Sequence, residues 1–561
     1  MNDTPKLRTG GQQVVDALLA QGTDTVFFVP GESYLDVLNA LYAQQDALRV
    51  IACRHESAAA FMAEAHGKLT GRPGICMVTR GPGATNASIG VHTAFQDATP
   101  MILLVGQVGR DMMEREAFQE IDYRRMFGPF TKWVAQIEDA SRVTEYMMRA
   151  FSVAMSGRPG PVVLALPEDM LTDSAFPGNS KRVEIPCSYP APQAMLRLRE
   201  CLARARKPLM ILGGSSWTDA GLRDIRSFVA QHGLPVACAF RRQDLFDNRH
   251  ANYVGEVGIG LNPELAQAIR ESDLLLAVGT RLGEIVTSGY TLLDVPVPQQ
   301  ALVHVLPCAE ELGRVYQPEL KVLASMDAFA QAAARLPPPD AAPWSGWLQD
   351  LRGKYTSYIG PSTREARLDP AGVIIALREK LETDAIITNG AGNYSAWAHR
   401  YHQFSAPRSQ LAPTSGAMGY GVPAAVAAKL HCPTRQVVCL AGDGCFLMSS
   451  QELATVKRHG LAIIFIVFNN GMYGTIRMHQ EINYPGRPIG TDLCNPDFVL
   501  YAQSFGIPAE RVETTAAFAP SLERALNAGG AYLIELAIEA EILTPRATLS
   551  GLRRAALQAS T

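Results

Sequence analysis

A chain of 561 residues is too long for a single compact core, because domains usually hold about 100 to 200 residues, so three or four folded units are expected. Hydrophobic residues make up 47% and charged residues 19% of the sequence, which is typical of globular domains and excludes an intrinsically disordered chain. The 51 Lys and Arg residues against 54 Asp and Glu residues give a net charge of -3, which is too balanced for the whole surface to bind a phosphate backbone, so nucleic acid is not an expected partner.

The cysteines and the N-terminal segment indicate the compartment. Ten cysteines are scattered along the chain without any Cys-x-x-Cys pair, so they are predicted to be buried hydrophobic residues, not disulfide partners or zinc ligands. Residues 1–15 lack the apolar core of a signal peptide, and the longest strongly apolar run, 461–468, is too short to span a bilayer. These features predict a cytoplasmic protein.

Short apolar runs rich in Val, Ile and Leu recur along the chain, and each is followed by a turn and a helix-like stretch. This pattern predicts parallel strands joined by crossover helices. In chain order the runs are 26–29, 75–78, 101–105, 162–166, 209–212, 274–278, 385–388, 437–441, 463–468 and 532–536. Two proline-rich segments, 171–194 and 335–343, are predicted linkers. The expected fold class is α/β, with three doubly wound parallel-sheet domains over residues 1–175, 190–335 and 360–550.

Polar residues follow two neighbouring strands of the last predicted domain. The strand 437–441 runs into the sequence Gly-Asp-Gly at 442–444, and a helix is predicted to begin near Ser449 or Ser450. The next strand, 463–468, ends in Asn-Asn-Gly-Met at 469–472. Open α/β sheets bind ligands at the carboxyl ends of their strands, so both motifs are expected at one binding site.

The residue types at these two strand ends suit a magnesium site. Mg²⁺ prefers hard oxygen ligands and commonly bridges one or two protein groups to phosphate oxygens. The carboxylate of Asp443, the side-chain amide of Asn470 and the main-chain carbonyl of Met472 offer three such oxygens. Gly442 and Gly444 would let a diphosphate approach the backbone closely, and the helix beyond them would favour negative charge.

Each motif alone also occurs in ordinary turns, but the two together are more specific. The pair resembles the thiamine diphosphate signature of the superfamily that includes pyruvate oxidase and acetolactate synthase. The resemblance covers nearly the whole chain and implies a pyrimidine-binding, a central and a diphosphate-binding domain, in the positions of the three predicted units. It also implies thiamine diphosphate and Mg²⁺ as cofactors.

In the first domain, the segment 54–59 (Arg-His-Glu-Ser-Ala-Ala) resembles the one that carries the family's cofactor-activating glutamate. By this resemblance Glu56 is catalytic and forms a hydrogen bond with the N1′ atom of the aminopyrimidine. Without the resemblance, Glu56 would be an acidic residue in the first turn of a helix, where the helix dipole favours negative charge.

Further segments resemble parts of the family's cofactor site. Residues 79–86 resemble a glycine-rich loop along the cofactor, and residues 415–423 resemble the segment that supports its bent shape, with Met418 between the two rings. Turn glycines and a core methionine are the alternative interpretation. The implied cofactor contacts are Gly392, Asn393, Tyr394, Gly416, Met418, Gly442, Asp443, Gly444, Cys445, Asn470, Met472 and Gly474, with Asp443, Asn470 and Met472 also the metal ligands.

The first domain indicates the branch of the superfamily. The segments 106–108, 117–122 and 157–162 resemble the acetolactate synthase (acetohydroxyacid synthase) large subunit, and the chain has no adjacent His-His pair like that of the simple decarboxylases. By this resemblance Phe118 and Gln119 are catalytic residues that border the substrate, and Gln119 donates a hydrogen bond near the reacting carbonyl. An ordinary polar loop residue is the alternative for Gln119.

The resemblance implies a carboligase, which decarboxylates a 2-oxo acid such as pyruvate and joins the resulting enamine to a second carbonyl. Two pyruvates would give acetolactate. Another thiamine diphosphate-dependent lyase, such as a 2-oxo acid decarboxylase or a diketone hydrolase, is the second hypothesis. A nucleotide-binding relative without catalysis is the third, although such a protein would have no use for Glu56.

Three departures from the acetolactate synthase pattern bear on the substrate and on a second cofactor. Glu168 stands where the family has a lysine, and His479 stands where it has a tryptophan that shapes the acceptor pocket. His479 is either a proton donor or an ordinary surface histidine. Residues 255–260 depart from the Met-His-Gly stretch of flavin-binding relatives, yet residues 213–215 and Arg281 could contact a dinucleotide, so FAD is a candidate cofactor.

The resemblance also implies the assembly. In the family, the residues corresponding to Glu56 and Asp443 act on one cofactor from different subunits, so a homo-oligomer, either a dimer or a tetramer, is expected. The expected partners are a small 2-oxo acid and a carbonyl acceptor, with neither nucleic acid nor membrane. The presence of a regulatory subunit stays open.

Overall fold

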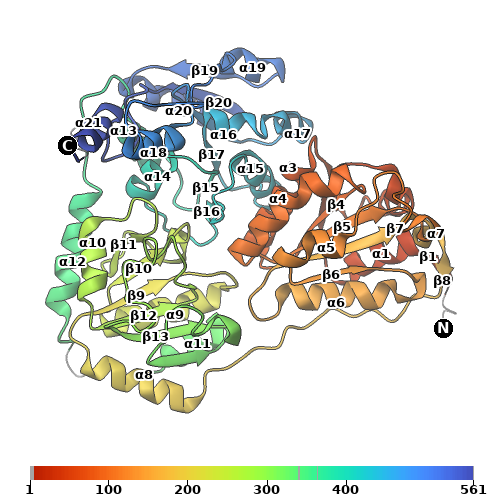
Figure 1. The fold of residues 1–561 in the computed structure, drawn as a ribbon, viewed down its shortest axis with the longest axis horizontal. Coiled ribbons are helices and arrows are strands. Elements are labelled where there is room, and N and C mark those ends of the chain that lie inside the picture. The colour runs from red at the N-terminus through yellow and green to blue at the C-terminus, as the bar shows by residue number, and fades with distance from the viewer. Residues whose placement is uncertain (1–5, 339–341, 363, 560–561) are drawn as a thin grey trace. The chain divides into compact units, whose positions relative to one another are not determined.

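The computed structural model describes residues 6–338, 342–362 and 364–559 (Figure 1). The chain divides into two compact units. The first unit holds residues up to Pro186 together with Val426–His431 and Ser449–His459. The second holds Cys187–Ala425, Cys432–Met448 and Gly460–Thr561, and it contains both the central and the C-terminal sheet.

The N-terminal sheet has six parallel strands in the order β3-β2-β4-β5-β7-β6. Its central strands carry apolar side chains on both faces, because helices pack on each side. A short antiparallel pair, β1 with β8, ties the two ends of the domain together. The strands are β1 Arg8–Thr9, β2 Thr25–Phe28, β3 Arg49–Ala52, β4 Gly74–Val78, β5 Met101–Gln107, β6 Trp133–Gln136, β7 Pro161–Pro167 and β8 Ser174–Ala175. The helices are α1 Gly10–Ala20, α2 Leu35–Tyr42, α3 Glu56–Thr70, α4 Pro82–Asp97, α5 Tyr123–Phe127, α6 Val143–Met155 and α7 Glu168–Thr172.

The central sheet has six parallel strands in the order β11-β10-β9-β12-β13-β14. Numbered within the domain, this is the order 3-2-1-4-5-6, which is typical of dinucleotide-binding folds. Buried clusters cover both faces of the sheet. The strands are β9 Pro208–Leu212, β10 Val236–Ala239, β11 Tyr253–Val257, β12 Leu274–Val278, β13 Ala301–Leu306 and β14 Leu320–Leu323. The helices are α8 Pro192–Arg204, α9 Asp219–His232, α10 Pro263–Glu271, α11 Met326–Ala333 and α12 Ser345–Tyr358.

The C-terminal sheet has six parallel strands in the order β16-β15-β17-β18-β20-β19. Numbered within each domain, this order and that of the N-terminal sheet are both 2-1-3-4-6-5. The strands are β15 Ile386–Asn389, β16 Gln410–Leu411, β17 Val437–Gly442, β18 Ile464–Asn469, β19 Ala509–Val512 and β20 Tyr532–Ala537. The helices are α13 Pro370–Lys380, α14 Ser395–Tyr401, α15 Gly421–His431, α16 Asp443–Leu447, α17 Leu453–Arg458, α18 Gly474–Asn483, α19 Phe498–Ser504, α20 Thr515–Asn527 and α21 Leu549–Ala559.

The three predicted parallel-sheet domains are confirmed, and each of the ten predicted apolar runs forms a strand. The exact domain boundaries stay predictions. Within the first predicted linker, residues 176–191 form neither helix nor strand. Residues 335–338 and 342–343 of the second also form none, and its residues 339–341 lie outside the described part of the chain.

The predicted burial of all ten cysteines is wrong for four of them. Cys187 and Cys494 are exposed, and Cys308 and Cys432 are half-buried. The four lie in loops or at helix ends, where no sheet face covers them. All ten are free thiols, as expected. Among the described residues, no helix is long and apolar enough to cross a membrane.

Candidate active site

A cavity of about 250 Å³ lies at the carboxyl ends of three neighbouring strands of the C-terminal sheet. Its walls include residues 391–394 after β15, residues 442–445 at the end of β17, and residues 470 and 472–476 after β18. Between β15 and β17 the strand order reverses direction, and ligands bind at such switch points in open α/β sheets. All twelve residues predicted as cofactor contacts line this cavity.

Asp443 is held rigidly in the cavity wall. It is the first residue of α16 and only 3% exposed. Its Oδ1 atom accepts a hydrogen bond from the main-chain N–H of Gly444 (2.9 Å), and its Oδ2 atom accepts bonds from the N–H of Gly471 (2.9 Å) and from Asn495 Nδ2 (2.8 Å). Burial raises the pKa of the Asp443 carboxyl, while these hydrogen bonds oppose the shift. A bound cation would favour the ionised form.

The helix after β17 was predicted to begin near Ser449 or Ser450, and this start is wrong. Helix α16 begins at Asp443 itself, and a 3₁₀ turn at Ser450–Glu452 then leads into α17. The strand β17 therefore passes into a helix through Gly442 alone, with no intervening loop.

The two flanking glycines have a packing role that the sequence did not reveal. A Cβ atom on Gly442 would lie 3.0 Å from Cδ1 of Tyr394, and one on Gly444 would lie 2.6 Å from Cε1 of Tyr473. The aromatic rings already occupy this space, so only glycine fits at position 444. Tyr394 is fixed in turn, because its hydroxyl accepts a hydrogen bond from Gly390 N (3.0 Å) and its ring stacks on Phe468.

The turn after β18 supplies two further oxygens. Gly471 has a φ of +66°, which lets the chain turn sharply, and Asn470 Oδ1 accepts a bond from Met472 N at 3.3 Å. The Met472 carbonyl accepts from Gly474 N at 2.9 Å and keeps a second lone pair. Within the described ranges no group of three or more His, Cys, Asp or Glu residues could hold a metal. One carboxylate with an amide and a carbonyl oxygen instead fits a hard cation such as Mg²⁺ that completes its shell with phosphate oxygens.

Asn495 is a site residue that the sequence analysis missed. Its Nδ2 atom donates to both Asp443 Oδ2 (2.8 Å) and Asn469 Oδ1 (3.0 Å). The amide of Asn469 donates in turn to Glu535 of β20 (2.8 Å). No short motif joins these positions, because a helix and a long loop separate Asn495 from β18. Only the folded chain shows that they form one network.

In the N-terminal unit, Glu56 is the first residue of α3 and half-buried. Its Oε2 atom accepts a hydrogen bond from Asn86 Nδ2 (2.9 Å), which belongs to the predicted glycine-rich loop and lies in α4. The main chain before Glu56 is anchored by Glu452, whose Oε1 accepts from the N–H groups of Arg54 (2.9 Å) and His55 (3.1 Å). Burial raises the pKa of Glu452, which is 0% exposed. Glu452 was also missed by the sequence analysis.

Phe118 and Gln119 lie beside the glycine-rich loop of the same unit. The backbone of Gln119 has a φ of +66° and packs so closely on Gly81 that a Cβ there would lie 2.7 Å from that of Gln119. The Oε1 atom of Gln119 is buried with no hydrogen-bond partner in the described structure. Phe118 is 75% exposed, so its ring has no cover within this unit.

Two positions that depart from the family pattern, Glu168 and His479, lie in different surroundings. Glu168 begins α7 and pairs with Arg80, with Nη1 and Oε2 2.7 Å apart, so a neighbouring cation matches the reversed charge. His479 is exposed on α18 and is not among the residues of the cavity wall.

Two loops of the central domain approach each other closely. Gly214 and Gly279 follow β9 and β12, and a Cβ on Gly214 would lie 2.3 Å from the Gly279 carbonyl oxygen. These two loops meet at the switch point of the central sheet.

Three doubly wound sheets, with an oxygen-lined cavity at a switch point of the last one, are the arrangement of α/β proteins that bind a ligand at the carboxyl ends of their strands, and the oxygens suit a hard cation beside a phosphate. Residues 8–126, 196–333 and 390–536 match the family models of thiamine pyrophosphate enzymes, for their N-terminal TPP binding domain, central domain and C-terminal TPP binding domain respectively. The chain belongs to the thiamine pyrophosphate (thiamine diphosphate) enzyme family.

Within this family the chain is similar to acetolactate synthase large subunits. It is 31% identical over 534 residues to the acetolactate synthase isozyme 2 large subunit of Escherichia coli, covering 94% of this chain and 95% of that protein. The large subunit of Parasynechococcus marenigrum is 31% identical over 554 residues, covering 95% and 88%. That of Corynebacterium glutamicum is 30% identical over 540 residues, covering 93% and 85%.

Proposed function

We propose that this thiamine diphosphate-dependent enzyme is a carboligase, which decarboxylates a 2-oxo acid such as pyruvate and joins the remaining fragment to a second carbonyl compound. The observation that carries the proposal is the convergence of all twelve predicted cofactor residues on one cavity at the carboxyl ends of β15, β17 and β18. The similarity to acetolactate synthase large subunits over more than nine-tenths of the chain supports the carboligase assignment.

The residues of the cavity define how the cofactor would be held. Asp443, Asn470 and the Met472 carbonyl would bind Mg²⁺, and the glycines of residues 442–444 and 392 would lie along the diphosphate. When bound, thiamine diphosphate supplies the nucleophilic carbon and the electron sink of the reaction. The protein therefore has to bind, orient and control protons, and no separate nucleophile motif is needed.

The N-terminal unit would supply the proton chemistry. Glu56, oriented by Asn86, would hydrogen-bond a ring nitrogen of the aminopyrimidine and pass a proton at that atom. Gln119 would donate a hydrogen bond to the reacting carbonyl, and the exposed Phe118 would border the substrate. We further propose a homo-oligomer in which Glu56 of one subunit serves the cofactor held by Asp443 of another.

The second candidate function is that of a different thiamine diphosphate lyase, either a 2-oxo acid decarboxylase or a diketone hydrolase. Two residues support this second candidate function. Glu168 is engaged with Arg80, and His479 replaces an aromatic residue on α18. The first reverses the charge of the family's lysine, and the second replaces the tryptophan that shapes the acceptor pocket in acetolactate synthases, so the acceptor is where this chain would differ.

Product analysis separates the two candidates. Purified protein with thiamine diphosphate and Mg²⁺ is given pyruvate alone, and the products are identified by mass spectrometry before and after acid treatment. Acetolactate, converted to acetoin by acid, supports the carboligase, whereas acetaldehyde as the main product supports the decarboxylase. A panel of other 2-oxo acids, aldehydes and diketones extends the search if pyruvate is not consumed. If no compound is turned over while the cofactor binds, the chain is a binding protein without catalysis.

Bound FAD and a cytoplasmic location stay predictions. The loops after β9 and β12 meet where a dinucleotide would bind, and their glycines permit a close approach of the main chain. The visible absorbance spectrum of the purified protein tests flavin binding directly, because a flavin that copurifies gives the protein a yellow colour.

A further inference from the structure

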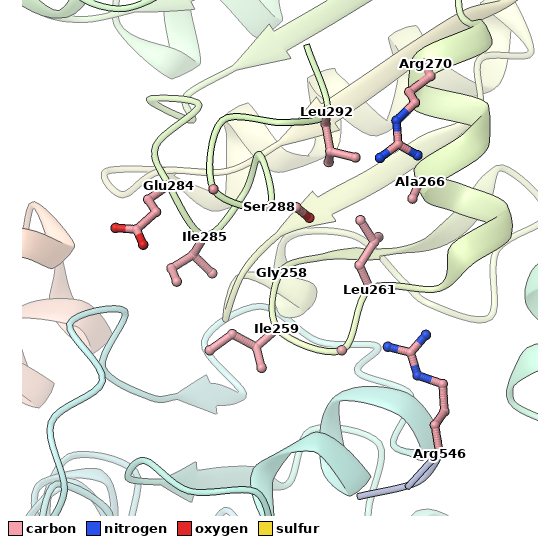
Figure 2. A pocket seen from close by; sticks show the side chains of 12 residues that line it. Gly258, Ile259, Leu261, Ala266, Arg270, Glu284, Ile285, Ser288, Leu292 and Arg546 are labelled. Carbon is pink, nitrogen blue, oxygen red and sulfur yellow. The ribbon is translucent and has the colours of Figure 1, made fainter. Parts of the chain in front are cut away.

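The central and C-terminal domains lie in one compact unit, and segments of both line a second cavity (Figure 2). The central domain contributes residues 258–261 and α10, and the C-terminal segment contributes Arg546. Residues 258–260 lie where flavin-binding relatives have their Met-His-Gly stretch, so this cavity is expected to belong to the predicted dinucleotide site. A different set of contacts between the same two domains, at the end of β10, is buried and polar.

The loop after β10, residues 240–248, joins the central domain to the C-terminal domain through buried hydrogen bonds. Asp244 Oδ2 accepts from the main-chain N–H groups of Ser409 (3.1 Å) and Gln410 (3.3 Å), where β16 begins. The main-chain N–H of Gln243 donates to Gln410 Oε1 at 2.8 Å. Asp244 and Gln243 are both buried. The loop 240–248 is therefore fixed against the C-terminal sheet.

Arg241 of this loop binds two main-chain carbonyls of the C-terminal domain. Its Nη2 atom donates to the Gly390 carbonyl at 2.9 Å, and its Nη1 atom donates to the Pro413 carbonyl. The residue is 3% exposed, and its φ of +59° is a conformation that a non-glycine residue keeps only where the surrounding structure holds it. Because the donors of a guanidinium group lie in one rigid plane, Arg241 fixes the separation of the two carbonyls.

Both carbonyls belong to turns that continue into the wall of the candidate cofactor cavity. Gly390 directly precedes the wall residues 391–394, and a Cβ on it would lie 2.5 Å from Sγ of Cys445 in the same wall. The Pro413 carbonyl also accepts from Gly416 N at 3.1 Å, and Gly416 lines the cavity. A shift of either carbonyl would therefore move the main chain of the cavity wall.

We propose that Arg241 is a positioning residue of the cofactor site, which sets the spacing of the two wall segments that follow Gly390 and Pro413. Arg241 does not itself line the cavity, so it acts through the main chain. The inference rests on the proposed placement of thiamine diphosphate between these segments. It makes the affinity for the cofactor depend on one side chain of the central domain.

Isothermal titration of thiamine diphosphate at saturating Mg²⁺ tests the proposal without any substrate. Arg241→Gln and Arg241→Lys are each expected to weaken cofactor binding about tenfold or more, because a supporting residue outside the first shell is lost. Lysine keeps the charge but offers a single point of donation in place of the planar fork, so it should not restore the affinity. The titrations are made well below the melting temperature of each variant, so that the affinity of the folded chain is measured.

Arg352→Gln is the matched control. Arg352 of α12 likewise donates to main-chain carbonyls, at 2.7 to 3.1 Å, but these belong to residues 248, 249 and 253 of the central domain. Its replacement should lower the melting temperature and leave the affinity for thiamine diphosphate unchanged. Trp397 lines the cofactor cavity and gives a spectroscopic readout. The change of tryptophan fluorescence at saturating cofactor should be altered in Arg241→Gln and natural in Arg352→Gln.

The natural protein is the reference that separates the two questions. If it does not bind thiamine diphosphate at all, the proposed function fails, and the positioning role fails with it. If it binds, and Arg241→Gln and Arg241→Lys bind as tightly, the proposed function stands and the positioning role is overturned. An equal loss of affinity in Arg352→Gln would also overturn the role, because a general loosening of the central domain would then explain the effect.

Discussion

At the scale of single residues, the two carboxylates of the proposed mechanism are held in different ways. Asp443 is buried and accepts three hydrogen bonds from its own domain, whereas Glu56 is half-buried and has one side-chain donor, Asn86. The first arrangement fixes both oxygens, as a metal ligand requires. The second leaves one oxygen of Glu56 available, as a proton-transferring group requires.

This difference predicts that removing the charge of Glu56 affects turnover, whereas removing the charge of Asp443 affects cofactor binding. Glu56→Gln should lower turnover by about a hundredfold or more, because a general acid–base contribution is lost, while cofactor affinity changes little. Asp443→Ala should abolish Mg²⁺-dependent binding of thiamine diphosphate. Titration calorimetry measures the binding and steady-state kinetics the turnover. Unchanged turnover in Glu56→Gln would remove this residue from the mechanism.

Asn495 is expected to position the metal ligand without touching the metal. Asn495→Ala removes the donor that links Asp443 to Asn469, and the loss of such an outer-shell partner typically costs about 10 to 100-fold in metal affinity. The measurement is a Mg²⁺ titration in the presence of thiamine diphosphate. Asn527→Ala, at the exposed end of α20, is the matched control. Equal Mg²⁺ affinity in the Asn495 variant and the control would contradict the role.

Glu256, a departure from the flavin-binding pattern, gives a pH-dependent prediction. Burial raises the pKa of its carboxyl from 4.5 to about 8, with Arg241 opposing the shift, and Oε1 has no hydrogen-bond partner among the described residues. The folded state therefore holds a proton that the unfolded state releases between pH 4.5 and 8. Stability is lost as the pH rises through that window, by up to about 1.4 kcal/mol per pH unit.

Glu256→Gln removes this penalty, so its advantage in melting temperature over the natural protein should grow from pH 5 to pH 8 and then level off. Thermal denaturation at four pH values between 5 and 9 measures it. An advantage that stays constant across the range would show that Glu256 does not titrate with the raised pKa.

At the scale of secondary-structure elements, the sequence predicts best where burial is most uniform. All four inner strands of the N-terminal and of the C-terminal sheet were predicted, because helices cover both faces and most of the strand residues are apolar and buried. Edge strands such as β3, with an exposed Arg49, and the two-residue β16 carry no such run. Their positions are set by pairing with the strand beside them.

Some residues of the candidate site could be predicted from the sequence and others could not. The residues in short motifs at strand ends, such as Asp443 and Asn470, were predicted, because parallel strands bring their carboxyl ends together. Asn495 and Glu452 were not predicted, because each contacts the site from a separate loop or helix through a single hydrogen-bonding group. The direct start of α16 at Asp443 was missed because Gly-Asp-Gly is typical of a turn and not of a helix start.

Helix α21 is joined to α18 by an ion pair. It buries none of its own residues, and Arg553 forms two bonds, of 2.6 and 2.8 Å, with Glu481 of α18. This pairing, with help from Gly486 N and Arg477, lowers the pKa of Glu481 from 4.5 to about 2. The contribution to stability is therefore present above about pH 4.5 and is lost as the pH falls toward 2.

Arg553→Gln should loosen α21 at neutral pH. The variant loses both hydrogen bonds to the Glu481 carboxylate, so amide exchange in residues 549–559 should speed up, by about severalfold for a solvent-exposed pair. Hydrogen-exchange mass spectrometry gives the rates. Arg554→Gln changes the neighbouring exposed arginine, which has no ion pair in the described structure, and should leave exchange as it was. Similar exchange in both variants would mean that other contacts hold the helix.

At the scale of the whole molecule, the N-terminal and C-terminal sheets share one strand order, and each carries predicted site residues at the carboxyl ends of its strands. The first presents Glu56 and residues 79–86, and the second presents Asp443 and Asn470. Two similar domains, each carrying half of the proposed site, would suit an assembly in which subunits complete one another.

Mixing two inactive variants tests this arrangement. Glu56→Gln and Asp443→Ala subunits are unfolded or dissociated together and reassembled in equal amounts. If the two residues act from different subunits of a dimer, each mixed dimer regains one intact site, and about a quarter of the natural activity returns. If they act within one subunit, every site in the mixture keeps one defect and no activity returns. Separately treated variants are the control.

The N-terminal unit is not continuous in sequence, because Glu452 and its neighbours at 449–459 fold with it although they follow β17. A polypeptide ended at Pro186 would thus lack the acceptor for the amides of Arg54 and His55. A hydrogen bond of this kind contributes about 0.5 to 1.5 kcal/mol to stability. Proteolytic fragments or gene fusions that separate residue 186 from residue 449 would therefore loosen the backbone that aims Glu56, even if every residue of the first domain were retained.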